Sequence, residues 1–215
     1  MSLLKHAPRF NARDAVRIAQ EIYGVRAMAA ALPSERDQNF LLQTESGDHF
    51  VLKIANATED RELLEAQQQA MARVAQDAPI CQRVVESLGG ASIAEIESPA
   101  GVRHFVWLVT YQPGVPLGGV KRHSPELLFD LGRRIGQLDR ALVGFDHPAV
   151  HRDFHWDLAN GLRTVREYEP LVADAEMRRL VGKLAADFER NVAPLLPRLR
   201  RSVIHNDAND YNALV

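Results

Sequence analysis

Near the beginning of the chain, apolar residues recur every three or four positions, which predicts an amphipathic helix. Asn11 is a suitable N-cap, Asp14 falls in the first turn, and Gly24 is a typical residue to end the helix. Residues 39–44 and 49–55 then favour strands, and the tetrapeptide ESGD between them is typical of a hairpin turn. The pattern therefore predicts a helix followed by an antiparallel hairpin.

A second helical pattern begins at about Thr58 or Glu59 and places Leu63 and Val74 on one apolar face. Beyond it the chain favours strands again, and the tripeptide PAG between the last two runs is a turn signal. The three runs are centred on residues 84–85, 91–98 and 103–111. Residues 1–112 are therefore expected to form one lobe with an antiparallel sheet.

The composition changes after residue 112, where glycine and proline become frequent and predict a linker over residues 113–123. Ser124 and Pro125 form a cap and a first-turn proline that start a long helix, and another helix starts near Asp174 and ends at Pro194 and Pro197. Residues 124–215 should form a mainly helical lobe, which makes the fold class α+β. The predicted apolar faces are Leu128, Leu131, Ile135, Leu138 and Leu142 in the first helix, and Met177, Leu180, Val181, Leu184 and Phe188 in the second.

Composition narrows the possible classes of protein. The 215 residues are 46% hydrophobic and 25% charged, as in ordinary globular proteins, and the net charge of −2 does not favour nucleic acid or an anionic membrane as a partner. Cys81 is the only cysteine, so no internal disulfide forms and a reducing compartment fits best. Neither a secretory signal nor a membrane-spanning run is recognisable. We expect a cytoplasmic protein.

Two segments around the hairpin carry candidate binding chemistry. Lys53 interrupts an apolar strand, so it either emerges at a rim as an ordinary surface lysine or meets an anion, because burying an unpaired ammonium is costly. The preceding segment SERDQNF lacks the glycines of a P-loop. Ser34, Gln38 and Asn39 could nevertheless donate hydrogen bonds to phosphate oxygens, and the alternative is a plain polar turn.

The segment SVIHNDANDYNALV, residues 202–215, places polar residues between two short apolar runs. This pattern fits a strand–loop–strand motif in which His205, Asp207 and Asn212 follow the spacing HxDxxxxN. In phosphoryl transfer, an aspartate at this position accepts the proton of the attacking hydroxyl, and an asparagine five residues later binds a metal ion. The alternative is a turn rich in Asn and Asp, which local hydrogen bonds favour.

The segment HRDFHWD, from residue 151, superficially offers the same pattern. Asn would be needed at position 158, where Leu158 stands, so Asp153 is not expected to be a catalytic base. One alternative is a metal cluster of the His and Asp side chains at 151, 153, 155 and 157. We favour an ordered loop near the cleft, in which Trp156 packs and Asp157 contacts the amino group of a substrate.

Taken together, these motifs resemble one family. The hairpin with VLKI, the segment VWLVTYQPGVPLG and the late VIHNDANDYNALV resemble, in the same order, the aminoglycoside phosphotransferase and choline kinase group, which has a protein-kinase-like fold. LPSERDQNF, VLKIAN and HRDFHWDL look most like hydroxylysine-kinase-type proteins. Similar domains also occur fused to class-III aminotransferases.

The resemblance implies a role for each motif. Asp207 would be the catalytic base, with His205 anchoring its loop, and Asn212 would bind Mg²⁺. The family pairs its strand lysine with a helix glutamate, and here Glu62, Glu65 or Gln67 occupies the region of that glutamate. The implied ATP-binding groups are Lys53 for the α and β phosphates, the segment with Ser34, Gln38 and Asn39 over the phosphates, and Thr110 to Gln112 for adenine.

The resemblance also exposes one departure. Such kinases have a second metal-binding aspartate after the catalytic loop, whereas this chain stops at Val215. The sequence is therefore expected to be either a fragment of a longer polypeptide or a damaged copy, with a fold truncated after that loop and poor activity alone. The favoured function is an ATP-dependent phosphotransferase that modifies a hydroxyl of a small amino alcohol or hydroxy-amino acid such as hydroxylysine. The alternative is a non-catalytic nucleotide-binding or regulatory module of a multi-domain enzyme.

Overall fold

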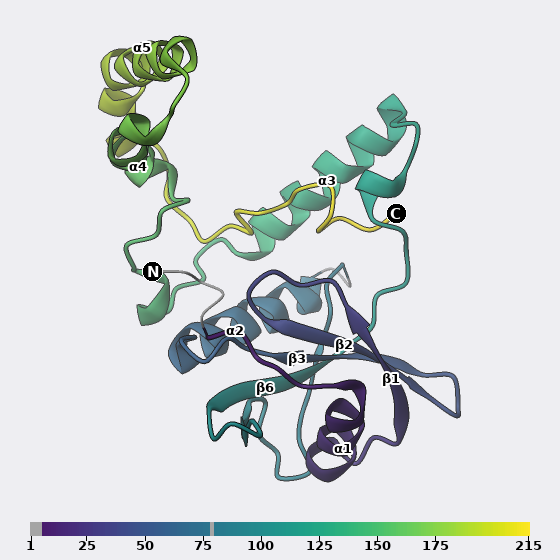
Figure 1. The fold of residues 1–215 in the computed structure, drawn as a ribbon. Coiled ribbons are helices and arrows are strands. Elements are labelled where there is room, and N and C mark those ends of the chain that lie inside the picture. Colours follow the sequence, from purple (N-terminus) through teal and green to yellow (C-terminus); the bar gives the residue numbers. More distant parts are fainter. Residues whose placement is uncertain (1–5, 78–79) are drawn as a thin grey trace.

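The computed structural model describes residues 6–77 and 80–215 and has an α+β architecture (Figure 1). Its centre is a six-stranded antiparallel sheet with the order β1-β2-β3-β6-β4, in which β5 also pairs with β6. The predicted hairpin and the later strand runs are confirmed. The strands are β1 Ala27–Leu32, β2 Gln38–Thr44, β3 His49–Ile54, β4 Val84–Val85, β5 Ala94–Glu97 and β6 Arg103–Thr110.

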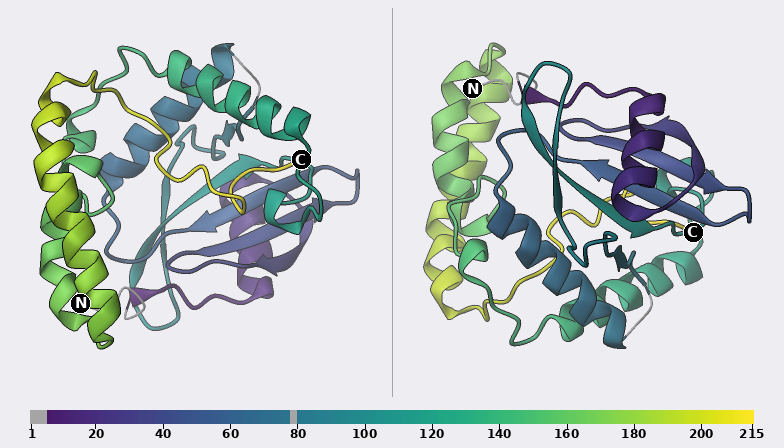
Figure 2. Two further views of the ribbon diagram at one scale, coloured as in Figure 1. Left: turned by 90° about the horizontal axis from the view of Figure 1, so that it is seen from above. Right: turned by 90° about the horizontal axis from the view of Figure 1, so that it is seen from below.

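Two helices cover opposite faces of this sheet, as Figures 1 and 2 show. Helix α1 (Ala12–Tyr23) begins at the predicted cap Asn11, ends at Gly24, and packs on the face that carries Leu52. Helix α2 (Arg61–Asp77) packs on the other face, which carries Val51 and Trp107. Because side chains alternate along a strand, Lys53 lies on the α2 face.

Strand β1 was not predicted. Its sequence AMAAAL is rich in alanine, which is depleted in strands, so the local pattern gives no strand signal. The strand nevertheless pairs with β2 over its whole length, from Ala27 opposite Thr44 to Leu32 opposite Asn39. Tertiary pairing has therefore overridden local propensity at this edge of the sheet.

The second half of the described chain is helical, and the helices expected after Ser124 and Asp174 are confirmed with those residues as N-caps. A short additional helix, α4, was not predicted. Several side chains of the predicted apolar faces are exposed, among them Leu128, Met177 and Leu184. Within residues 6–77 and 80–215, no helix combines the length and apolarity needed to span a bilayer. The helices are α3 Pro125–Ala141, α4 Gly161–Tyr168 and α5 Ala175–Asn191, with 3-10 turns at η2 Leu117–Gly119, η3 Pro148–Val150, η4 Leu158–Asn160, η5 Glu169–Leu171 and η6 Ala193–Arg198.

Polar and apolar contacts join the helical half to α2. The guanidinium of Arg73 donates to the carbonyls of Ala141 and Val143, each at 2.7 Å, at the end of α3. Val203, from the segment that follows η6, packs into an apolar cluster with Val74 and Leu142. These contacts place the C-terminal segment on the α2 side of the sheet, opposite α1 (Figures 1 and 2).

The strand–loop–strand motif expected over residues 202–215 is not formed, and this prediction is wrong. Residues 202–209 have no regular secondary structure, and the apolar end of the chain pairs with the linker instead. Val115 and Val215 exchange backbone hydrogen bonds of 3.0 and 2.9 Å, and Pro116 and Leu214 form an isolated antiparallel bridge. A partner distant in sequence therefore satisfies the backbone of the last residues.

Candidate functional site

Lys53 lies in a polar pocket of about 200 Å³ between the sheet and α2. Its strand neighbours in register are Asn39 on β2 and Trp107 on β6, so the three side chains share one face of the sheet. The pocket is lined by Arg36, Asp37, Lys53, Glu59, Leu63, Leu64, Gln67, Trp107 and Arg152.

The ammonium of Lys53 is half-buried, and its surroundings only partly compensate its charge. Burial lowers the pKa of Lys53 below its ordinary value, and the nearby Asp37 carboxylate acts in the opposite direction. The ammonium lies 5.8 Å from the centre of the Trp107 ring. Among the described residues, neither Lys53 nor Arg152 forms an ion pair with a carboxylate. Because the pocket holds two cations, Lys53 and Arg152, without an ion-paired carboxylate, it is suited to binding an anion.

Helix α2 places an amide, not a carboxylate, beside Lys53. Gln67 lines the pocket, whereas Glu62 and Glu65 do not, and Glu65 is paired with Arg61 at 2.9 Å. Of the three residues considered for the lysine's partner, only Gln67 therefore lies at the pocket.

Within the segment from Ser34 to Asn39, the Gln38 side chain is bonded to the backbone of Phe10, whereas Ser34 and Asn39 are bonded to each other. Both atoms of the Gln38 amide are bonded to the backbone of Phe10, which donates to Oε1 at 2.8 Å and accepts from Nε2 at 2.7 Å. The predicted phosphate contact of the Gln38 side chain is therefore corrected: this amide anchors the segment before α1. Asn39 donates to the exposed Ser34 hydroxyl at 3.3 Å, and the buried Asn39 Oδ1 has no partner among the described residues.

The backbone groups expected to bind adenine are partly occupied. The N–H of Thr110 donates to the backbone carbonyl of Arg83 at 2.9 Å, and the N–H of Tyr111 donates to the backbone carbonyl of His49 at 3.2 Å. The Gln112 side chain donates to the Cys81 carbonyl at 2.9 Å. The N–H groups of Thr110 and Tyr111 therefore already form backbone hydrogen bonds at the sheet.

Polar groups of the Asp207 loop form hydrogen bonds with one another. Asn209 donates to one carboxylate oxygen of Asp207 at 2.7 Å, and Asn212 donates to the other at 2.8 Å. Asn212 also donates to the Asp207 carbonyl at 2.9 Å, and the Asp207 N–H donates to the His205 ring at 3.3 Å. The sequence spacing thus brings His205, Asp207 and Asn212 into one cluster.

Backbone hydrogen bonds also join the linker to the Asp207 loop. Leu117 donates to the Ala213 carbonyl at 2.9 Å, and Gly118 donates to the Asp210 carbonyl at 2.8 Å. Asn206, directly before Asp207, has a φ of 62°, a conformation that asparagine tolerates better than most residues. The direction of the Asp207 side chain therefore depends on the linker that follows β6.

The segment from His151 to Asp157 has a structural role at two positions. Asp153 pairs with Arg163, which holds the pKa of that carboxyl below its usual range, and also accepts from Asn160 at 3.1 Å. His151 contacts Asp146 at 2.6 Å. Because these groups are directed to different partners, the metal-cluster alternative is not supported.

One residue of the same segment, Trp156, contacts the Asp207 loop through its backbone. The Trp156 side chain is 64% exposed, and the centre of its ring lies 5.9 Å from the centre of the Phe154 ring. The Trp156 carbonyl accepts from Asn206 at 3.4 Å, which joins the segment to the loop, and Asp157 caps η4 through the Ala159 N–H at 2.9 Å.

Two charged pocket residues, Asp37 and Arg152, were not predicted from the sequence. Asp37 stands inside the quoted segment SERDQNF, one position before Gln38, so its carboxylate was available as a signal. Arg152 stands inside HRDFHWD, but only the folded chain brings it to the Lys53 pocket, because η3 packs against α2.

Known relatives are consistent with this arrangement. Hydroxylysine kinases from Xenopus laevis and Danio rerio are 32% and 29% identical to the whole chain, which spans 61% and 63% of their lengths. The fold matches an aminopropanol kinase associated with a microcompartment, with a TM-score of 0.70 and 19% identity over 95% of this chain and 65% of that one. It also matches an amicoumacin kinase in complex with AMP-PNP, Ca²⁺ and Ami, with a TM-score of 0.61 and 14% identity over 90% of this chain and 55% of that one.

The family itself is identified by a match that covers most of the chain. Residues 29–215 match the family described as "Phosphotransferase enzyme family", known by the abbreviation APH. This range includes the Lys53 strand, the linker and the Asp207 loop. The chain therefore belongs to the APH phosphotransferase family.

Proposed function

We propose that this chain carries the nucleotide-binding and catalytic-loop parts of an ATP-dependent kinase that acts on a hydroxyl of a small amino alcohol or hydroxy-amino acid. The main support is that the Asp207 loop is hydrogen-bonded to the linker after β6, and β6 pairs with the Lys53 strand. In this proposal, residues 1–112 bind the nucleotide, 113–123 form the linker, and 124–215 carry the catalytic loop.

Lys53 and Arg152 would bind the triphosphate, because both cations line one pocket without a paired carboxylate among the described residues. Ser34 and Asn39 lie on the chain that enters β2 and would cover the phosphates. Adenine would contact the segment from Thr110 to Gln112 through groups other than the two N–H donors already used by the sheet.

Asp207 would orient the acceptor hydroxyl for attack on the γ-phosphorus. The new bond joins the acceptor oxygen to phosphorus, the bond between phosphorus and the β–γ bridging oxygen breaks, ADP leaves with that electron pair, and Asp207 accepts the hydroxyl proton. The hydrogen bonds from Asn209 and Asn212 fix the carboxylate in one orientation, which favours transfer in a single geometry.

The side chains of the Asp207 loop also fit a magnesium ion. With its nitrogen donated to Asp207, Asn212 has its amide oxygen left as a ligand atom, and Mg²⁺ prefers oxygen ligands shared between protein and phosphates. When bound, the ion would neutralise charge on the phosphates. Trp156, whose carbonyl accepts from Asn206, and the next residue, Asp157, are the proposed contacts for the acceptor's ammonium group.

An acceptor panel tests this function. The names of the relatives suggest hydroxylysine and aminopropanol, to which we add ethanolamine, choline and homoserine. The purified chain, and any longer form of the protein, should transfer phosphate from ATP to at least one of them. ATP binding without transfer to any acceptor by either form would support a non-catalytic nucleotide-binding module instead.

A further inference from the structure

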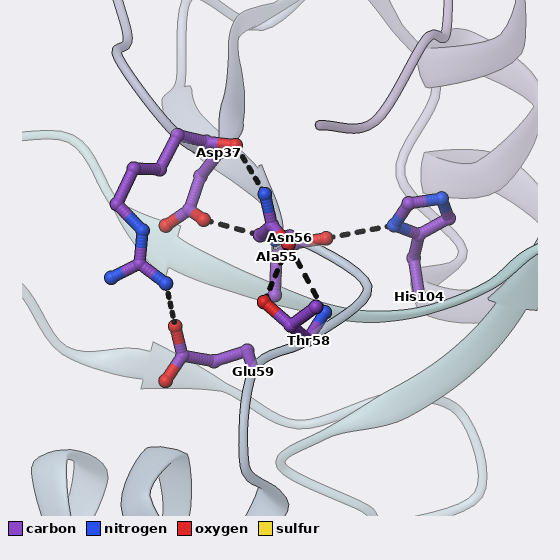
Figure 3. A network of polar contacts seen from close by, with 7 residues as sticks. Asp37, Ala55, Asn56, Thr58, Glu59 and His104 are labelled. Atoms are coloured by element: carbon purple, nitrogen blue, oxygen red, sulfur yellow. Dashed lines mark hydrogen bonds and ion pairs between the residues drawn. The ribbon is translucent and has the colours of Figure 1, made fainter. Parts of the chain in front are cut away.

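The Lys53 pocket contains two carboxylates, and they are in different states. Glu59 is paired with Arg36 at 3.1 Å and its side chain is only 13% exposed. Asp37 uses one oxygen to accept the Asn56 N–H at 3.0 Å, and Figure 3 shows its other oxygen turned away from that bond. Of these two carboxylates, Asp37 is the one whose charge acts on Lys53.

We propose that Asp37 is the positioning carboxylate of Lys53, in place of a carboxylate on α2, where Gln67 supplies an amide. The inference rests on the proposed function, in which Lys53 binds phosphate. Asp37 acts through Lys53 and is assigned no contact with the acceptor.

The backbone holds Asp37 firmly in this place. It directly precedes β2, whose Asn39 lies opposite Lys53 in the β2–β3 pair. Asn56, at the end of β3, is 1% exposed and accepts hydrogen bonds from the Thr58 N–H at 3.0 Å and from the Thr58 hydroxyl at 2.8 Å (Figure 3). A carboxylate fixed by a buried network is preorganised to orient a neighbouring cation.

The charge of Asp37 also has a consequence for pH dependence. Phosphate binding needs the protonated ammonium, so affinity falls as pH rises through the pKa of Lys53. The charged groups around Lys53 are Asp37 and Arg36 before β2, Glu59 before α2, and Arg152 from the segment after η3. Removing the negative charge of Asp37 leaves burial to lower that pKa without opposition, so the loss of affinity should move to lower pH.

Moving the carboxylate tests the proposal. Asp37→Asn keeps an oxygen for the Asn56 N–H and should weaken AMP-PNP binding in calorimetry by about tenfold, because the phosphate-binding ammonium loses the charged group that orients it. Adding Gln67→Glu supplies a carboxylate from α2 and should restore affinity to within about threefold. Asp48→Asn, in the β2–β3 turn where Asp48 accepts from the Ser46 hydroxyl at 2.7 Å, is the matched control and should leave binding unchanged.

A second measurement does not depend on nucleotide. The pH dependence of Lys53 acetylation by acetic anhydride, followed by mass spectrometry, should shift to lower pH in Asp37→Asn and return with Gln67→Glu. If Asp37→Asn does not fold, Asp37→Ser keeps a hydroxyl acceptor for Asn56 and should give the same shift.

The possible results separate the two proposals. If Lys53→Met binds AMP-PNP as well as the unchanged chain, the proposed function fails, and acetylation still decides the role of Asp37. If Lys53→Met weakens binding but removal of the Asp37 charge changes neither affinity nor acetylation, Asp37 is not the positioning residue and the proposed function stands.

Discussion

The two halves of the candidate site are built in different ways. Lys53 stands on β3, whose neighbours Leu52 and Ile54 are completely buried, so the packed core fixes its backbone. Asp207 stands in an irregular and mostly exposed loop, where hydrogen bonds within the loop and to the linker fix its direction. We call the Lys53 part, which we propose binds nucleotide, the binding half, and the Asp207 part, which we propose is catalytic, the catalytic half. Apolar packing holds the first and polar contacts hold the second, so different substitutions should disturb each half.

The largest effect is expected at the catalytic half. Asp207→Asn keeps the size of the side chain and removes the proton acceptor, so phosphate transfer to the best acceptor of the panel should slow by about 10²–10⁴-fold. The nucleotide affinity should stay nearly constant, because Lys53 and Arg152 are unchanged. Steady-state rates and AMP-PNP calorimetry check the two halves of this prediction. A parallel loss of affinity would show that the two halves are not separable.

The binding half should respond in the opposite way. Lys53→Met keeps an unbranched apolar stem in the pocket and removes the charge, so ATP affinity should fall by about 10- to 100-fold, as for the loss of a hydrogen bond to a charged group. Thermal unfolding should change little, because Lys53 forms no carboxylate ion pair among the described residues. A large drop in Tm with unchanged affinity would mean that Lys53 is structural.

A substitution at Gly114 in the linker should disturb the Asp207 loop through the contact between the linker and the end of the chain. Gly114 has a φ of 148°, and an added Cβ would lie 2.9 Å from the Leu214 Cβ. Gly114→Ala should therefore separate Val115 from Val215 and lower the stability of this contact by about 1–3 kcal/mol. Faster hydrogen exchange at the Val115 and Val215 amides would report this separation.

The matched control for Gly114 lies in α3. A Cβ added to Gly136 meets nothing within 4 Å, so Gly136→Ala should be neutral or stabilising by up to about 1 kcal/mol. Exchange at the linker should be unaffected by this control. Equal effects of the two substitutions on linker exchange would refute the dependence of the loop on Gly114.

The smallest effect on transfer is expected at the segment that imitates a catalytic loop. Asp153 is paired with Arg163 and Asn160, so Asp153→Asn should loosen the start of α4 and leave the transfer rate within about threefold. The same steady-state assay compares it with Asp207→Asn. If Asp153→Asn abolishes transfer and Asp207→Asn does not, the catalytic loop has been misassigned.

Local patterns predicted the elements whose signals lie within one segment. The cap at Asn11, the hairpin that carries Lys53 and the helix start at Ser124 each combine a periodic apolar pattern with a recognisable end signal. Strand β1 carries no such signal, because alanine fits a strand only once β2 provides its hydrogen bonds.

The site was predicted in part for the same reason. The spacing of Asp207 and Asn212 is local, and the structure brings the two side chains into contact. The position of Arg152 beside Lys53 and the pairing of Val115 with Val215 join segments far apart in the sequence. Gln38 was misinterpreted because its partner Phe10 lies 28 positions away.

The central claim is that one nucleotide contacts both halves, and hydrogen exchange with and without AMP-PNP and Mg²⁺ tests it most directly. The account predicts that nucleotide slows exchange together in residues 34–54 and 203–215, while the amides of α5 keep their rates. Protection in only one of these two segments, or protection centred on α5, would contradict a shared site for Lys53 and Asp207.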